Sequence, residues 1–223
     1  MTPRQTLLNW CDQTLQPQLF KDGAPNGLQI EGNDQIRHII TAVTASQAAI
    51  NHAIAQGADT LLVHHGLFWR NEPTAIIGWK KQRIAALLAH NINLIGYHLP
   101  LDAHPTLGNN VQLAVKLHWQ PENTFGEQNL LNIGTLPESQ RTLAQLAQAV
   151  EQTLGRTPTI IGNPKQPLTR IAWCTGGAQW YFQAQTYISQ AKSPKRNTIL
   201  PTKQTQHSSL QDTMPPSDTA SKH

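Results

Sequence analysis

The sequence has only two cysteines, Cys11 and Cys174, among its 223 residues. Neither belongs to a CxxC pair, and two are too few for a disulfide framework in a chain of this length. No apolar run approaches the roughly 18 residues of a membrane-spanning helix, and residues 1–5 lack the apolar core of a signal peptide. These absences predict a reduced, soluble, cytoplasmic protein without a membrane partner.

Charged residues are also scarce, and their imbalance is local. The formal net charge is +4, but residues 189–223 contain five Lys and Arg residues and only two Asp residues. The preceding 188 residues contain 12 positive and 11 negative side chains. A nucleic-acid-binding face needs Lys and Arg clustered on the fold itself. Nucleic acid is therefore not an expected partner.

The alternation of periodicities predicts an α/β fold of two similar lobes, each with a mixed sheet covered by helices. Expected helices cover residues 4–16, 46–55 (capped by Ser46), 79–90, 107–117, 139–154 (capped by Ser139) and 176–188. Expected strands cover residues 36–44, 60–65, 94–98, 130–135, 159–161 and 170–174, with an extended piece at 28–30.

The same pattern divides the chain into three parts. Residues 1–125 form a first α/β lobe, and residues 126–190 form a partial, incomplete second lobe. Residues 191–223 are rich in Thr, Ser, Gln and Pro and show no periodicity. Because such a segment buries too little apolar area to offset the entropy of ordering, we expect it to be a disordered tail.

Histidines and a carboxylate follow two neighbouring predicted strands. The run 60–65 ends in His64 and His65, and the run 94–98 ends in His98, with Asp102 four residues later. The carboxyl ends of parallel strands meet at one edge of a sheet, where α/β proteins place their sites. Gly66 permits the backbone to turn, so the adjacent imidazoles can converge rather than point to opposite faces.

Imidazole and carboxylate ligands together suit Zn, Mn, Fe, Ni or Co. We therefore expect His64, His65 and Asp102 to bind a divalent transition metal, with open positions for water. Three roles remain open for His98: a ligand, a proton shuttle, or a residue that holds Asp102. The competing interpretation is that all these histidines are ordinary hydrogen-bonded side chains. Trp69 suits either stacking on a ring substrate or packing against the fold.

Four segments, in order, resemble one protein family: residues 24–32 (APNGLQIEG), 62–67 (LVHHGL), 96–102 (GYHLPLD) and 175–178 (TGGA). The chain resembles the Nif-three-like, dinuclear-metal proteins called GTP cyclohydrolase 1 type 2 homologues, over about residues 4–190. The resemblance implies two similar α/β lobes and a toroidal homohexamer. It also implies two metal ions per chain, with His64, His65 and Asp102 matching family ligands. Two ions with a bridging water suit hydrolysis of an amide, an amidine or a phosphate ester.

The sequence also departs from that family. Members carry a GHxxTE motif near the C-terminus that supplies the remaining ligands, and no such motif occurs among these 223 residues. We therefore expect a truncated or frameshifted C-terminus and an impaired hydrolase acting on a purine nucleotide or a related small molecule. The alternatives are a non-catalytic metal-binding or regulatory scaffold that forms a ring, and a non-functional gene product.

Overall fold

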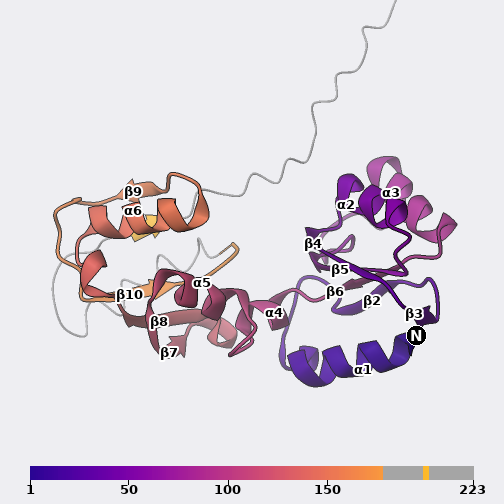
Figure 1. Cartoon of the computed structure of the whole chain (residues 1–223), viewed down its shortest axis with the longest axis horizontal. Helices are drawn as coiled ribbons and strands as arrows, with labels where there is room; N and C mark the ends of the chain where they lie inside the picture. The colour runs from indigo at the N-terminus through magenta and orange to yellow at the C-terminus, as the bar shows by residue number, and fades with distance from the viewer. Residues whose placement is uncertain (178–197, 201–223) are drawn as a thin grey trace, which may run out of the picture. The chain divides into compact units, whose positions relative to one another are not determined.

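The structure is a computed structural model that describes residues 1–177 and 198–200 (Figure 1). The chain divides into two compact units: Met1–Pro137 with Thr169–Ser193, and Glu138–Leu168 with Pro194–His223. Each unit is described below by itself. Among the described residues, no helix is both long enough and apolar enough to cross a membrane.

A four-stranded sheet forms the centre of the first unit. Its strand order is β2-β6-β5-β4; β4, β5 and β6 run parallel, and β2 runs antiparallel to β6. The strands are β2 (Gly27–Ile30), β4 (Ile39–Thr44), β5 (Thr60–His65) and β6 (Asn93–Gly96). Because β5 and β6 are parallel neighbours, their carboxyl ends lie at the same edge, where the predicted site residues follow.

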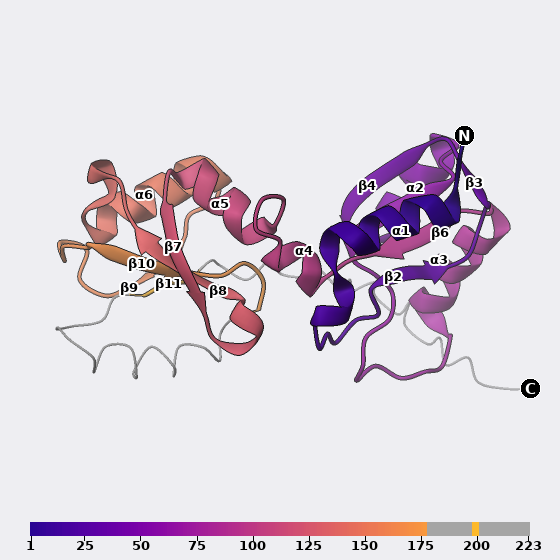
Figure 2. The same cartoon turned by 90° about the horizontal axis from the view of Figure 1, so that it is seen from below.

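Helices cover both faces of this sheet (Figures 1 and 2). They are α1 (Arg4–Leu15), α2 (Gln47–Ala55) and α3 (Gly78–Ala89). Ile50 of α2 and Leu87 of α3 pack with Leu61 of β5 in one buried apolar cluster. Leu8 of α1 packs with Ile95 of β6 in another. Successive strand residues point to opposite faces, so the central strands β5 and β6 are buried on both sides, whereas Ile39 and Val43 of the edge strand β4 are exposed.

A buried amide fastens the amino ends of the central strands. Asn93 is fully buried. Its Nδ2 donates to the carbonyls of Asn33 (2.7 Å) and Asp59 (3.1 Å) and to Thr60 Oγ1 (3.4 Å). Its Oδ1 accepts from the backbone N–H of Gly32 (2.8 Å) and from Arg4 Nη1 (3.3 Å). One side chain therefore satisfies polar groups of several segments around the amino ends of the central strands.

The first unit continues into a three-stranded antiparallel sheet of order β10-β8-β7 (Figure 2). The strands of this sheet are β7 (Gln120–Phe125), β8 (Leu131–Thr135) and β10 (Arg170–Trp173). The helices α4 (Leu99–Ala103) and α5 (Asn109–Leu117) precede it in the chain. The buried Trp173 packs against Trp119, with ring centroids 5.2 Å apart. Its indole N–H donates to the carbonyl of Asn110, which ties β10 to α5.

The described residues of the second unit include the helix α6 and a pair of strands. The helix α6 (Leu143–Leu154) begins with a capping box, in which Thr142 and Gln145 satisfy each other's backbone N–H groups. The strands β9 (Thr159–Ile161) and β11 (Thr198–Leu200) pair antiparallel. A 3-10 turn at Glu138–Gln140 precedes α6.

The first unit also contains the short strands β1 (Thr2–Pro3) and β3 (Gln35–Ile36) and 3-10 turns at Pro17–Leu19 and Glu127–Asn129.

The α/β class is confirmed, and four predicted helices agree with α1, α2, α3 and α5 within two residues. Three expectations are wrong. Ser139 lies in a 3-10 turn, and the following helix is capped by Thr142. The strand β7 was not foreseen, because its sequence is polar and contains Pro121. Residues 198–200 form a strand where disorder was expected. The predicted helix 176–188 and the rest of the tail lie outside the described residues.

Candidate metal centre

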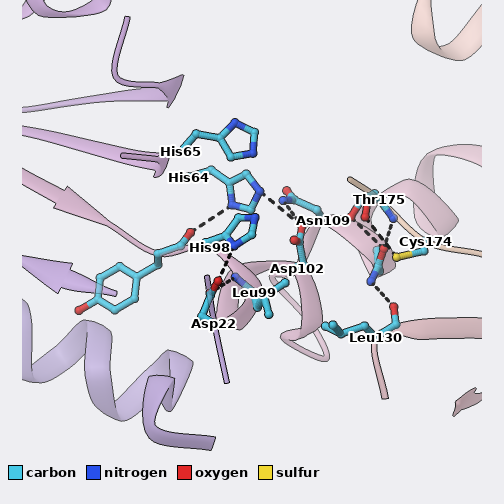
Figure 3. A network of polar contacts seen from close by, with 12 residues as sticks. Asp22, His64, His65, His98, Leu99, Asp102, Asn109, Leu130, Cys174 and Thr175 are labelled. Atoms are coloured by element: carbon cyan, nitrogen blue, oxygen red, sulfur yellow. Dashed lines mark hydrogen bonds and ion pairs between the residues drawn. The ribbon is translucent and has the colours of Figure 1, made fainter. Parts of the chain in front are cut away.

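The ends of β5 and β6 bring the predicted site residues together (Figure 3). Val63 pairs with Gly96 across the parallel strands, so the residues that follow on each strand are neighbours. His64 and His65 end β5, His98 follows β6, and Asp102 lies one turn later on α4. The three imidazoles converge: ring centroids lie 4.4 Å (His64–His65), 5.0 Å (His64–His98) and 5.7 Å (His65–His98) apart.

Gly66 is required for space rather than for backbone conformation. Gly66 does not have a positive φ, so the turn that follows the two histidines does not need a left-handed backbone conformation. A Cβ at Gly66 would lie 2.0 Å from Gln29 Oε1. Gln29 is itself fixed, because Oε1 accepts from the N–H of Leu67 (3.0 Å) and Nε2 donates to the carbonyl of Pro25 (2.8 Å). The glycine thus allows the Gln29 amide to brace the segment that follows the two histidines.

Replacing Gly66 with alanine is expected to displace the Gln29 amide and to lower the free energy of unfolding by about 1–3 kcal/mol. The matched control is Gly23→Ala, where an added Cβ meets nothing within 4 Å. We expect that control to stay within about 0.5 kcal/mol of the unmodified protein in urea unfolding. Equal stability of the two variants would show that Gln29 moves aside at no cost.

The Nδ1 atom of each imidazole is held by a protein group. His64 Nδ1 lies 3.1 Å from the carbonyl oxygen of Tyr97, His65 Nδ1 lies 3.1 Å from Thr44 Oγ1, and His98 Nδ1 lies 2.7 Å from Asp22 Oδ1. Carbonyl and carboxylate oxygens only accept hydrogen bonds, so the Nδ1 atoms of His64 and His98 carry protons. In the neutral form of these two rings, Nε2 is therefore the nitrogen whose lone pair can bind an ion.

Asp22 is a site residue that sequence reasoning missed. Its side chain is only 3% exposed and also accepts from the N–H groups of Leu99 (2.9 Å) and Ala24 (3.1 Å) and from Asn26 Nδ2 (3.1 Å). Burial raises its pKa, but the hydrogen bonds from His98, Leu99 and Asn26 outweigh burial and lower the pKa to about 2. The only sequence signal is its place just before the segment 24–32.

Asp102 is buried beside His64, with Oδ1 3.6 Å from His64 Nε2. The same Oδ1 accepts from Asn109 Nδ2 (2.8 Å) and Thr175 Oγ1 (3.1 Å). These two residues hold Asp102, whereas the His98 ring is hydrogen-bonded to Asp22. The backbone N–H of Thr175 donates to Asn110 Oδ1 (2.6 Å), which fixes the turn ahead of Gly176 and Gly177. The helix expected to follow that turn is outside the described residues.

The donor set suits a transition metal. His64, His65 and His98 each offer one ligand atom, and these atoms lie within 4.8 Å of one another. Burial, together with the neighbouring His64 and His98, lowers the pKa of His65 to about 4, which keeps its ring neutral near pH 7. Neutral imidazoles beside a carboxylate are ligands for Zn or Fe rather than for Ca or Mg. By contrast, burial and the charge of Asp102 raise the pKa of Cys174 to about 11, so its sulfur stays protonated.

Trp69 lines the same group of histidines. Its ring is edge-on to His98, with centroids 5.0 Å apart, and lies 5.9 Å from His65. Its neighbour Phe68 packs instead against the apolar cluster of the central sheet and lies under Lys80 Nζ, 4.9 Å from the ring centroid. The indole therefore shields the imidazoles on one side.

The chain is similar to known proteins over most of its length. The family model Duf34/NIF3 (NGG1p interacting factor 3) matches residues 2–190. A GTP cyclohydrolase 1 type 2 homolog from Neisseria meningitidis serogroup A is 59% identical over 183 residues, covering 82% of this chain and 73% of the relative. The homolog from Escherichia coli K12 is 44% identical over 185 residues, covering 82% and 72%. The solved structure of protein ybgI, of unknown function, matches with a TM-score of 0.80 and 40% identity, covering 84% of this chain and 75% of that one.

Proposed function

Because the chain belongs to the Duf34/NIF3 family, we propose that it is a metal-dependent hydrolase whose divalent ion is held by His64, His65 and Asp102. The proposed substrate is a purine nucleotide or a related amide, amidine or phosphate ester. The observation that carries the proposal is the convergence, at the ends of two parallel strands, of His64, His65 and His98, whose ligand atoms lie within 4.8 Å of one another. Asp102 adjoins this cluster, with Oδ1 3.6 Å from His64 Nε2. The family resemblance, which implies two metal ions per chain and a toroidal homohexamer, also supports the proposal, and we expect this assembly to be cytoplasmic.

The residues present fit a divalent ion. A bound ion would act as a Lewis acid that polarises a substrate and lowers the pKa of a water molecule. The protein itself orients the donors: the Tyr97 carbonyl and Thr44 fix the imidazoles of His64 and His65, and Asn109 and Thr175 fix Asp102. Such outer hydrogen bonds set ring orientation and ligand basicity. Trp69 offers a flat apolar surface beside the donors, which suits a ring substrate.

The test combines metal content with turnover. The full chain is loaded in turn with Zn, Mn, Fe or Ni and dialysed, and bound metal per chain is measured by elemental analysis. Each preparation is then incubated with GTP and other purine nucleotides while ring opening and phosphate release are followed. We expect at least one ion per chain and turnover that depends on it. Absence of any bound ion would overturn the proposal.

A second candidate function is a metal-binding scaffold without catalysis. It is favoured by the small number of donors that the described residues bring together, which are three imidazoles and Asp102 beside His64. Three protein ligands can hold one ion, but a two-metal clamp needs more donors. Bound metal without turnover, in an assembly that sediments as a ring-sized oligomer, would favour the scaffold over the hydrolase.

A further inference from the structure

We infer that His98 is a further ligand of the ion and that the buried carboxylate of Asp22 positions it. This inference rests on the proposed metal site and extends it. His98 comes from a different strand end than His64 and His65, yet its ring lies within 5.7 Å of both, centroid to centroid. The three imidazoles place one ligand atom each within 4.8 Å of one another. With Asp102 beside His64, His98 brings the protein donors to three imidazoles and one carboxylate, which are ligand types that zinc accepts.

The hydrogen bond to Asp22 decides which nitrogen of His98 is available. Asp22 Oδ1 lies 2.7 Å from His98 Nδ1, and its carboxylate accepts three further hydrogen bonds. An acceptor-only carboxylate requires the proton on Nδ1, so Nε2 presents its lone pair. A carboxylate that accepts from the second nitrogen of an imidazole is the usual partner of a metal-bound histidine, where it fixes the tautomer and raises basicity.

The neighbours of His98 show that its ring is held in place and is not a freely moving surface side chain. The side chain is 21% exposed and packs edge-on against Trp69, while Asp22 is 3% exposed. Asp22 also accepts from the N–H of Leu99, the first residue of α4, and the N–H of His98 itself donates to Asn26 Oδ1 (2.7 Å). Backbone and ring are thus fixed together, which holds the ring toward His64 and His65. A histidine needed only to tie down this loop would not have to be aimed at two other imidazoles.

Cobalt(II) binding tests the inference, because the visible absorption of the ion reports its ligands independently of activity. The full-length chain is compared with His98→Ala, His98→Gln, Asp22→Asn and the control His52→Ala, an exposed residue of α2. We expect both His98 variants to change the absorption bands and to weaken Co(II) binding. Asp22→Asn should keep the bands and weaken binding roughly 10–100-fold, the usual cost of losing an outer partner. His52→Ala should match the unmodified chain in both respects.

The outcomes separate this inference from the proposed function. Unchanged bands and affinity in either folded His98 variant, with binding lost in His65→Ala, would overturn the role of His98 alone. No Co(II) binding by the unmodified chain would overturn the metal site itself. Circular dichroism identifies a variant that fails to fold, and His98→Gln, which preserves much of the side-chain volume, serves if His98→Ala does. Restoration of the bands in His98→Ala by added imidazole would support ligation directly.

Discussion

Substitution of His65 by alanine is expected to remove most of the divalent metal bound by the chain. His65 belongs to the imidazole group, with its ring centroid 4.4 Å from that of His64 and 5.7 Å from that of His98. Removal of the ring deletes a direct donor, so the loss of affinity should exceed the roughly 10–100-fold effect of removing an outer partner. The measurement is elemental analysis after dialysis against a metal buffer, with zinc affinity determined by chelator competition.

The control for this prediction is His90→Ala. His90 is exposed at the end of α3, where Nδ1 lies 2.9 Å from the carbonyl oxygen of Ala86. That variant removes an imidazole from the same lobe without touching the strand ends, and its metal content should equal that of the unmodified chain. If His65→Ala retained full metal content, the assignment of the site to these strand ends would have to be abandoned.

Replacement of Asn93 by leucine is expected to destabilise the metal-free protein by about 3–5 kcal/mol. The side chains are similar in size, but leucine offers no donor or acceptor. The N–H of Gly32 and the carbonyl of Asn33 would lose their hydrogen bonds to the Asn93 side chain, and the carbonyl of Asp59 would keep only the hydrogen bond from the Asn93 backbone N–H (2.9 Å). Each buried polar group left without a partner costs about 1–3 kcal/mol. Urea unfolding of the metal-free protein measures the change.

The matched control is the same substitution on the surface. Asn51 is exposed on α2 and accepts one hydrogen bond from Gln47 Nε2 (2.9 Å). Asn51→Leu should change the free energy of unfolding by no more than about 0.5 kcal/mol. Similar losses in the two variants would mean that the effect comes from leucine itself and not from the buried hydrogen bonds of Asn93.

The parts of the fold that are strongly periodic could be read from the sequence. The apolar runs of β5 and β6 and the spacing of Leu7, Leu8 and Cys11 in α1 gave the elements almost residue by residue. The start of α6 was misplaced although the pair Thr142 and Gln145 is a readable capping-box signal. The polar strand β7 could not be found in this way, because it has neither an apolar alternation nor a run of β-branched residues.

The candidate site was only partly predictable for a different reason. Convergence of His64 and His65 followed from their place at a strand end, and the structure confirms that their rings are neighbours. Asp22 escaped notice, and Thr175 was recognised only as part of the segment 175–178, because each is a polar residue in a loop, far along the chain from the group that it contacts. No spacing rule relates such positions, since the tertiary fold alone makes them neighbours. Gly66 was expected to give backbone freedom, whereas in the structure it leaves the space that Gln29 occupies.

The wide separation of the site residues along the chain has a consequence for biosynthesis. The hydrogen bond between Asp22 and His98 spans 76 residues, and that between Asp102 and Thr175 spans 73. Contacts of such long range form late, because the entropy of closing a large loop has to be offset first. A chain leaving the ribosome carries His64 and His65 long before Thr175 has been synthesised to orient Asp102. The nascent chain therefore passes through a stage in which His64 and His65 are present but the hydrogen bond that orients Asp102 is not, so the arrangement proposed to bind an ion is completed only at the end of folding.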